Sequence, residues 1–103
     1  MSVQLSLDNF FRQIDAEKKT KYVNGIVDFS SKLKLLIVAV DKKEQTEIKL
    51  LLHSLKPLSQ YLTLNNLYNN LLLLEKDDKK MDISILNKIK TESQEIEDYL
   101  NSI

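Results

Sequence analysis

Cysteine and tryptophan are absent from the 103-residue sequence, and glycine and proline occur once each, as Gly25 and Pro57. Without cysteine, the chain can form neither disulfides nor thiolate metal sites. So little glycine and proline argues against a β-rich domain, because tight turns between strands use both residues heavily. Lysine plus arginine and aspartate plus glutamate number 15 each, so the formal net charge is zero. A nucleic-acid-binding protein is therefore not expected, since such proteins carry a basic excess on one face.

Long hydrophobic runs are also missing. The longest apolar segments cover residues 35–40 and 71–74, far short of the roughly 20 residues that span a bilayer. The first residues lack the basic segment followed by an apolar segment that marks a secretory signal. We therefore expect a cytoplasmic protein that does not enter a membrane, organised as a single domain over residues 1–103.

Leucine, in contrast, is abundant, with 19 residues placed at helical spacing. Apolar residues recur every three or four positions in the stretches 7–14, 22–40, 43–75 and 83–101, which predicts helices with an apolar face. The connectors between them are short and polar, and include the charged segment 75–80. Because helices joined by short connectors pack antiparallel, we expect an all-α fold, an antiparallel up-down four-helix bundle with a short additional N-terminal helix.

Two residues interrupt the predicted helices. Gly25 lies inside the stretch 22–40, where glycine costs about 1 kcal/mol relative to alanine, so we expect a close-packing reason for it. Pro57 lies inside the stretch 43–75, where proline removes a backbone hydrogen bond and clashes with the carbonyl of His53. The long helix is therefore expected either to kink at Pro57 or to break into two.

The only histidine, His53, lies in the middle of the third stretch. At helical spacing it shares one stripe with residues one and two turns away, while the apolar positions lie toward the other side. The members of this stripe are Lys49, His53, Lys56, Pro57 and Gln60. We therefore expect the imidazole to project outward from the bundle, with a lysine one turn before it and another one turn after it.

An exposed imidazole between two lysines suits some chemistries and not others. No second histidine, cysteine or carboxylate stands at ligand spacing, so a metal site is not expected. Neither a pocket nor the serine and acid partners of a hydrolytic triad are indicated. A neutral imidazole is a good nucleophile near neutral pH, and a lysine can neutralise phosphoryl oxygens as a point charge. The pattern therefore favours transfer of an anionic group through His53.

The segment around His53 resembles the signature helix of histidine-containing phosphotransfer domains. The matching residues are His53, Ser54, Leu55, Lys56, Ser59, Leu62, Leu67, Leu71, Leu74 and Glu75. The preceding helix is similar through Phe29, Leu33, Leu36 and Asp41. The resemblance covers nearly the whole chain, and departs from the family where two usual glycines are replaced by Pro57 and Thr63.

The resemblance implies a four-helix bundle with His53 as the phosphoacceptor and Lys56 stabilising the phosphoryl group. It implies two kinds of partner, a response-regulator receiver domain and a hybrid histidine kinase, with Lys49, Pro57 and Gln60 on the receiver-docking face. The chain would then be a monomeric phosphoryl carrier in two-component signalling. It would not be an enzyme, because it would have no turnover of its own. It would need no cofactor or metal, because the receiver brings Mg²⁺ and its acidic pocket.

Plainer interpretations stay open. His53 can be a surface histidine without a role, and the chain can be a binding protein without phosphoryl transfer. Such a protein would be a degenerate phosphotransfer fold that blocks a receiver or kinase, or an unrelated helical adaptor, and Pro57 beside the histidine favours it. The asparagine pairs at 65–66 and 69–70 are expected to form one polar face of a helix without being a site.

Overall fold

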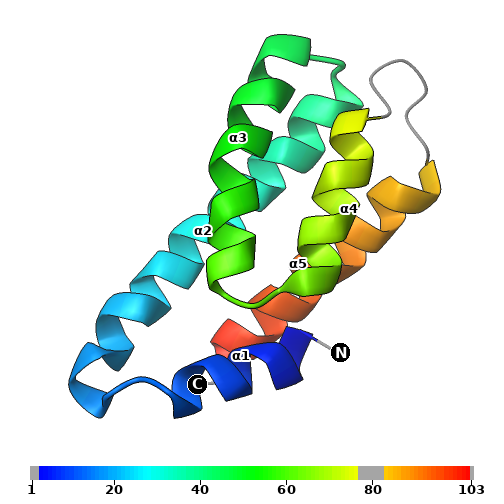
Figure 1. The fold of residues 1–103 in the computed structure, drawn as a ribbon. Helices are drawn as coiled ribbons and strands as arrows, with labels where there is room; N and C mark the ends of the chain where they lie inside the picture. The colour runs from blue at the N-terminus through cyan, green and yellow to red at the C-terminus, as the bar shows by residue number, and fades with distance from the viewer. Residues whose placement is uncertain (1–2, 77–82, 103) are drawn as a thin grey trace.

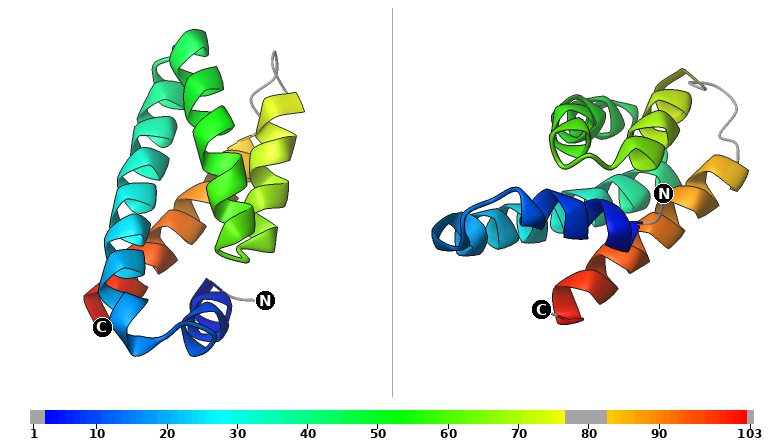
Figure 2. Two further views of the ribbon diagram at one scale, coloured as in Figure 1. Left: turned by 60° about the vertical axis from the view of Figure 1, so that its left-hand side comes forward. Right: turned by 60° about the horizontal axis from the view of Figure 1, so that its bottom comes forward.

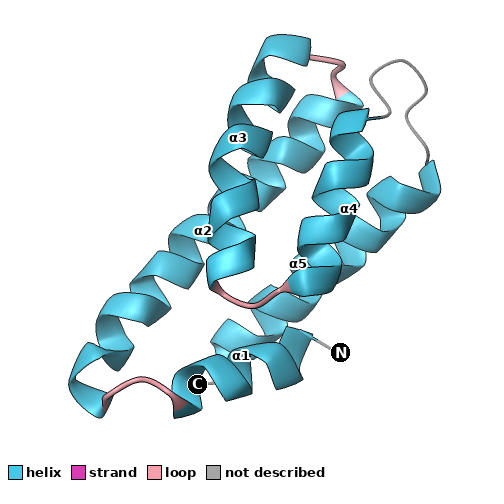
Figure 3. Cartoon of the chain, in the orientation of Figure 1, coloured by secondary structure: helices cyan, strands magenta, loops and turns pink. Residues whose placement is uncertain are grey.

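The computed structural model describes residues 3–76 and 83–102. All regular elements within these residues are helical, so the predicted all-α class is confirmed (Figure 3). In chain order they are α1 (Val3–Arg12), the short 3₁₀-helix η1 (Ala16–Lys18), α2 (Lys19–Asp41), α3 (Gln45–Tyr61), α4 (Asn65–Lys76) and α5 (Ile83–Ser102). Most of the charged connector expected over 75–80 lies outside the described residues.

Four of the helices contact one another in a closed circuit. α3 packs between α2 and α4, and α5 completes the circuit by packing against both α2 and α4. Figure 1 shows α3 and α4 in front of α2 and α5, with successive helices running in opposite directions. α1 lies across one end of this arrangement, where it contacts α5 (Figure 2).

Polar and aromatic contacts attach α1 to the other helices. The hydroxyl of Tyr99 on α5 donates a hydrogen bond of 3.1 Å to the carboxylate of Asp8 on α1. The ring of Phe10 packs edge-on against Tyr22 of α2 and against Tyr61 of α3. α1 therefore closes the end of the core at which the first turn of α2 and the last turn of α3 meet.

The core is formed by the apolar face that each helix turns inward, as the spacing of leucines predicts. The largest fully buried side chains are Leu7, Ile26, Phe29, Leu33, Leu36, Leu52, Leu55, Leu64, Leu67, Leu71, Ile89 and Ile96. Burying one such side chain stabilises the fold by about 1.5–3 kcal/mol relative to exposing it. Polar residues occupy most of the outer faces, where some large apolar side chains such as Leu35 and Leu50 are also exposed. No helix in the described part of the chain is long and apolar enough to cross a membrane.

The long stretch 43–75 does divide into two helices, although the division is not at Pro57. α3 continues through Pro57 and ends at Tyr61, four residues later. Because proline has no backbone N–H, the carbonyl of His53 lacks the donor that residue 57 would otherwise supply. Loss of one hydrogen bond on the solvent side of a helix is tolerated here, since the buried side of α3 holds its turns together.

The same type of turn ends both α2 and α3. The residue after each cap has a positive φ, 57° at Lys43 and 61° at Thr63. The N–H of Thr63 bonds to the carbonyl of Gln60, and the next N–H, of Leu64, bonds to the carbonyl of Ser59. This pair of hydrogen bonds is the Schellman motif, which prefers glycine at the left-handed position. Two non-glycine residues therefore hold a conformation that costs them about 1–2 kcal/mol each.

Gly25 does not have the packing role that its position in a helix suggested. It lies exposed in α2, and a Cβ atom added to it would meet no neighbouring atom within 4 Å. The expectation of a close-packing reason is therefore wrong, because an alanine fits at this position without a clash.

Candidate functional site

His53 lies on the outward side of α3, as predicted from the spacing. Its side chain is exposed, whereas Leu55, two residues later, is 0 % exposed. The other members of the predicted stripe are the exposed Lys49, Pro57 and Gln60 and the partly buried Lys56. The stripe is therefore one face of α3 that borders solvent, with the imidazole near its middle.

Lys56 makes an ion pair that bridges two helices. Its ammonium nitrogen lies 2.6 Å from a carboxylate oxygen of Glu75, near the end of α4. The Lys56 side chain is 23 % exposed and that of Glu75 is 46 % exposed, so water screens the pair and its worth to stability is below about 1 kcal/mol. The lysine expected to face a phosphoryl group is thus held toward α4 by an anion of the chain itself.

A second lysine contacts the residue next to His53 from the opposite side of α3. The ammonium group of Lys32, on α2, donates a hydrogen bond of 3.3 Å to the hydroxyl of Ser54, the residue next to His53. Both Lys32 and Ser54 are partly buried. Lys32 takes part in none of the ion pairs found among the described residues. One ammonium group therefore lies beside the residue that follows His53, on the α2 side, and another belongs to the lysine three residues after His53, on the α4 side.

Apolar side chains are also exposed on this face. The hydrogen bond between Lys32 and Ser54 fixes the antiparallel register of α2 and α3. Leu35 follows Lys32 by one turn and Leu50 precedes Ser54 by one turn, so the two leucines lie at the same level of the paired helices. They are 56 % and 62 % exposed. We call this face the histidine surface: Lys32, Leu35, Lys49, Leu50, His53, Ser54, Lys56, Pro57 and Gln60.

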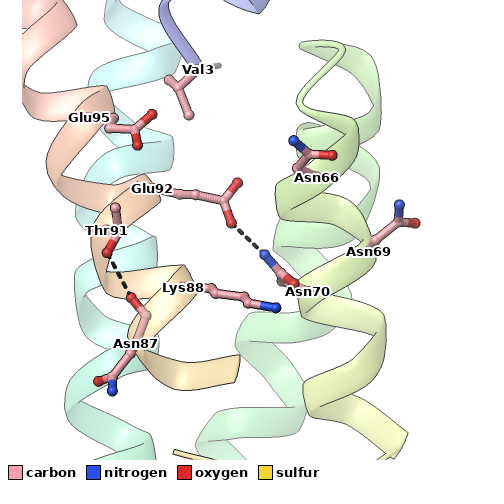
Figure 4. A pocket seen from close by; sticks show the side chains of 9 residues that line it. All are labelled: Val3, Asn66, Asn69, Asn70, Asn87, Lys88, Thr91, Glu92 and Glu95. Carbon is pink, nitrogen blue, oxygen red and sulfur yellow. Dashed lines mark hydrogen bonds between the residues drawn. The ribbon is translucent and has the colours of Figure 1, made fainter. Parts of the chain in front are cut away.

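A groove of about 690 Å³ lies on another side of the molecule, between α4 and α5 (Figure 4). We call it the amide groove; it is lined by Val3, Asn66, Asn69, Asn70, Asn87, Lys88, Thr91, Glu92 and Glu95. Figure 4 shows Glu92 of α5 and Asn70 of α4 pointing toward each other across it. The amide of Asn70 donates to the carboxylate of Glu92 at 2.5 Å. The groove therefore presents amides, a hydroxyl, carboxylates and the ammonium group of Lys88, but no nucleophilic ring.

The carboxylate of Glu92 is the perturbed acid of the amide groove. Burial raises its pKa above the ordinary value of 4.5, because the charged form loses contact with water. The hydrogen bond from Asn70 acts in the opposite direction, the nearby charge of Glu95 raises the pKa further, and Lys88 lowers it. The net increase in the pKa means that burial and the charge of Glu95 together outweigh the amide and the lysine.

Two features of these surfaces were missed by reasoning from the sequence. Lys32 was not connected with His53, because the two residues are on different helices and no spacing rule relates them. The asparagines of α4 were expected to form a plain polar face, whereas Asn66, Asn69 and Asn70 line a groove opposite α5. The only signal available for the groove was the density of asparagines in the segment 65–70.

No cluster of three or more histidine, cysteine, aspartate or glutamate side chains that could hold a metal ion occurs in residues 3–76 and 83–102. Positive charge on Lys32 and Lys56, near His53 in the sequence or on the facing helix, opposes a cation there. Searches against protein-family models, curated proteins and solved structures found no match to this chain. The chemistry of the two surfaces is therefore the basis for a functional proposal.

Proposed function

We propose that this chain is a phosphorelay intermediate that accepts a phosphoryl group on His53 and donates it to receiver-domain aspartates in two-component signalling. One observation carries the proposal: an exposed imidazole in mid-helix, over a fully buried core, with a partly buried lysine on either side. A ring in water is accessible to a partner, the packed helix keeps it in place, and the ammonium groups can neutralise the oxygens of a transferred group.

The backbone supports the resemblance to histidine-containing phosphotransfer domains in two respects. The closed circuit of α2, α3, α4 and α5 is compatible with their antiparallel four-helix bundle, with α1 as the short additional helix. The family's usual glycine ten residues after the histidine corresponds to Thr63, and Thr63 has a φ of 61°, in the region that favours glycine. A helix end of the kind that this glycine allows is therefore kept despite the substitution.

The proposed transfer is an in-line displacement at phosphorus. The lone pair on the ring nitrogen of His53 distal to the backbone attacks the phosphorus of an aspartyl phosphate on the receiver. The bond from phosphorus to the carboxylate oxygen breaks, and its electron pair stays on the carboxylate. The proton on the other ring nitrogen stays there or passes to water. The reverse step returns the phosphoryl group to a receiver aspartate, so the chain is a carrier without turnover of its own.

The partners follow from this chemistry. A receiver domain with its Mg²⁺ and acidic pocket supplies the metal, so the chain itself needs no cofactor. A hybrid histidine kinase, which holds a receiver domain, is the upstream partner in the proposal. Docking would use the histidine surface, with Lys49, Pro57 and Gln60 around the imidazole and the exposed Leu35 and Leu50 on its flank. We place this activity in the cytoplasm and assign it to the monomer.

The test is transfer of a radioactive phosphoryl group from phosphorylated receiver domains to the purified chain. We expect label on the wild type and loss of the label in acid, as is typical of a nitrogen–phosphorus bond. We expect none on His53→Gln, which has no nucleophilic ring. The far-UV circular dichroism of the variant should match that of the wild type, because His53 is exposed.

The matched control is Asn69→Gln, which changes an exposed side chain on α4 away from the histidine surface. It should accept label at the wild-type rate. Label retained on His53→Gln would exclude His53 as the acceptor, and an unlabelled wild type with a full panel of receivers would reject the proposal.

A second candidate is an adaptor or inhibitor that binds a receiver or kinase without accepting phosphate. The observation that favours it is the exposed ring of Pro57, one turn from the imidazole on the same stripe, where the family usually has a glycine. A pull-down separates the two candidates. Equal binding of a receiver by the wild type and by His53→Gln, with no transfer to either, would support the adaptor.

A further inference from the structure

Lys32 and Lys56 differ in the group that each ammonium already contacts. The ammonium of Lys56 is paired with the carboxylate of Glu75 at 2.6 Å. The ammonium of Lys32 has a neutral partner, the hydroxyl of Ser54 at 3.3 Å, and belongs to no ion pair of the described residues. An added anion must compete with Glu75 for Lys56, whereas at Lys32 it displaces only a hydroxyl.

The geometry also brings the ammonium of Lys32 to the residue that follows His53. Neighbouring Cα atoms are about 3.8 Å apart, and the Ser54 hydroxyl that Lys32 contacts belongs to the residue after His53. A lysine has four rotatable carbon–carbon bonds, so its ammonium can move several ångströms without any movement of α2. Lys32 comes from a different helix than the histidine, so the spacing along α3 gives no hint of it.

We propose that Lys32 binds the phosphoryl group on His53 and contributes more to its stabilisation than Lys56 does. This inference rests on the proposed function, because it names a residue that serves the same site. A phosphoryl group adds about two negative charges at neutral pH. Lys32 neutralises one of them from the α2 side, and Lys56 supplies a weaker contribution because Glu75 keeps part of its charge.

The experiment measures the rate at which His53 becomes labelled in Lys32→Met and Lys56→Met. Methionine keeps most of the length and the apolar stem of lysine and removes the charge. We expect Lys32→Met to slow labelling about tenfold, the loss of one charge-assisted hydrogen bond, and Lys56→Met to slow it about threefold or less. Glu75→Gln should speed labelling about twofold, because it frees the ammonium of Lys56.

The matched control is Lys34→Met. Lys34 is on the same helix but is paired with Glu97 of α5, away from the histidine surface. The Lys34→Met variant should leave the labelling rate of His53 unchanged. Lys32→Arg should keep most of the rate that Lys32→Met loses. A Lys32→Met variant that folds as the wild type and labels at its rate would overturn the inference.

A second measurement separates this inference from the proposed function. Inorganic phosphate is titrated into the chain while the ring signals of His53 are followed by NMR, with no receiver present. We expect phosphate to shift these signals with millimolar affinity, and Lys32→Met to weaken its binding at least threefold while Lys34→Met has no effect. A wild type that binds phosphate through Lys32 but accepts no label would reject phosphoryl transfer and keep the anion site. A wild type whose ring signals do not respond, or respond equally in Lys32→Met, would reject Lys32 as an anion-binding residue.

Discussion

On the histidine surface the charged and ring groups are an imidazole, two partly buried lysines and the exposed Lys49, and large apolar side chains lie exposed beside them. In the amide groove the polar groups are asparagines, two carboxylates, Thr91 and Lys88, and the Asn70 amide donates a hydrogen bond to the Glu92 carboxylate across the groove. Both surfaces rest on the same core, because α3 and α4 bury leucines against it in the same way. The comparison teaches that the leucine pattern produces the scaffold, while the residues between the leucines decide what each surface can bind.

The largest effect is expected from removing leucines beneath the two surfaces. Leu55 on α3 and Leu71 on α4 are both 0 % exposed. Leu55→Ala and Leu71→Ala should each lower the free energy of unfolding by about 3 kcal/mol, since each leaves a cavity in a packed core. Urea denaturation followed by circular dichroism measures this loss. His53→Gln, on the outward side, should change the stability by less than about 0.5 kcal/mol.

A large difference in the free energy of unfolding between Leu55→Ala and Leu71→Ala would contradict the idea that both surfaces rest on the same core. If one of them kept the stability of the wild type, the two surfaces would not share a single cooperative core.

A smaller effect is expected at the turns on either side of α3. Thr63→Gly should raise the free energy of unfolding by about 1 kcal/mol, because Thr63 holds a φ of 61° that glycine adopts without strain. Lys43→Gly should give a smaller gain, since a β-branched threonine resists this conformation more than a lysine. Thermal denaturation of both variants checks whether Thr63→Gly gains more stability than Lys43→Gly.

Thr46→Gly is the control, because Thr46 lies exposed inside the first turn of α3. The free energy of unfolding of this variant should fall by roughly 0.3–0.5 kcal/mol. A stability gain of the same size in all three variants would show that the positive φ is not the cause.

The smallest effect concerns Glu92 in the amide groove. Its raised pKa means that the folded state disfavours the ionised carboxylate, so Glu92 destabilises the fold above its ordinary pKa of 4.5 and not below it. Glu92→Gln should therefore raise the stability at pH 7 by roughly 0.5 kcal/mol, a small gain because the partly exposed charge is screened by water. A glutamine oxygen can still accept the hydrogen bond from Asn70.

The gain should shrink as the pH falls and be absent at pH 3, which denaturation curves at several pH values would reveal. Glu95→Gln, at another carboxylate of the groove, is the comparison variant. A gain from Glu92→Gln that persisted unchanged at pH 3 would contradict an electrostatic origin.

Much of the fold was predictable because helical periodicity is a local property. The stretches 22–40 and 83–101 correspond closely to α2 and α5, and the outward position of His53 follows from the same spacing. The end of α3 was not predictable from the usual signals. The sequence has proline at 57 but no glycine at 63, so the pattern predicts a kink or break at Pro57, whereas α3 ends at Tyr61, two residues before the left-handed Thr63. Burial of Leu62 and Leu64 on either side of Thr63 compensates for its conformation.

The sequence alone determined that the chain is helical, that its leucines face inward and that its one imidazole faces water, because each of these depends on residues three or four positions apart. Only the tertiary structure decided which lysine is occupied by Glu75, that Lys32 reaches Ser54, and that asparagines of α4 lie opposite carboxylates of α5. Each of these contacts joins residues about 20 positions apart in the chain. The register in which the helices pack brings the residues together, and a pattern within one helix does not specify that register.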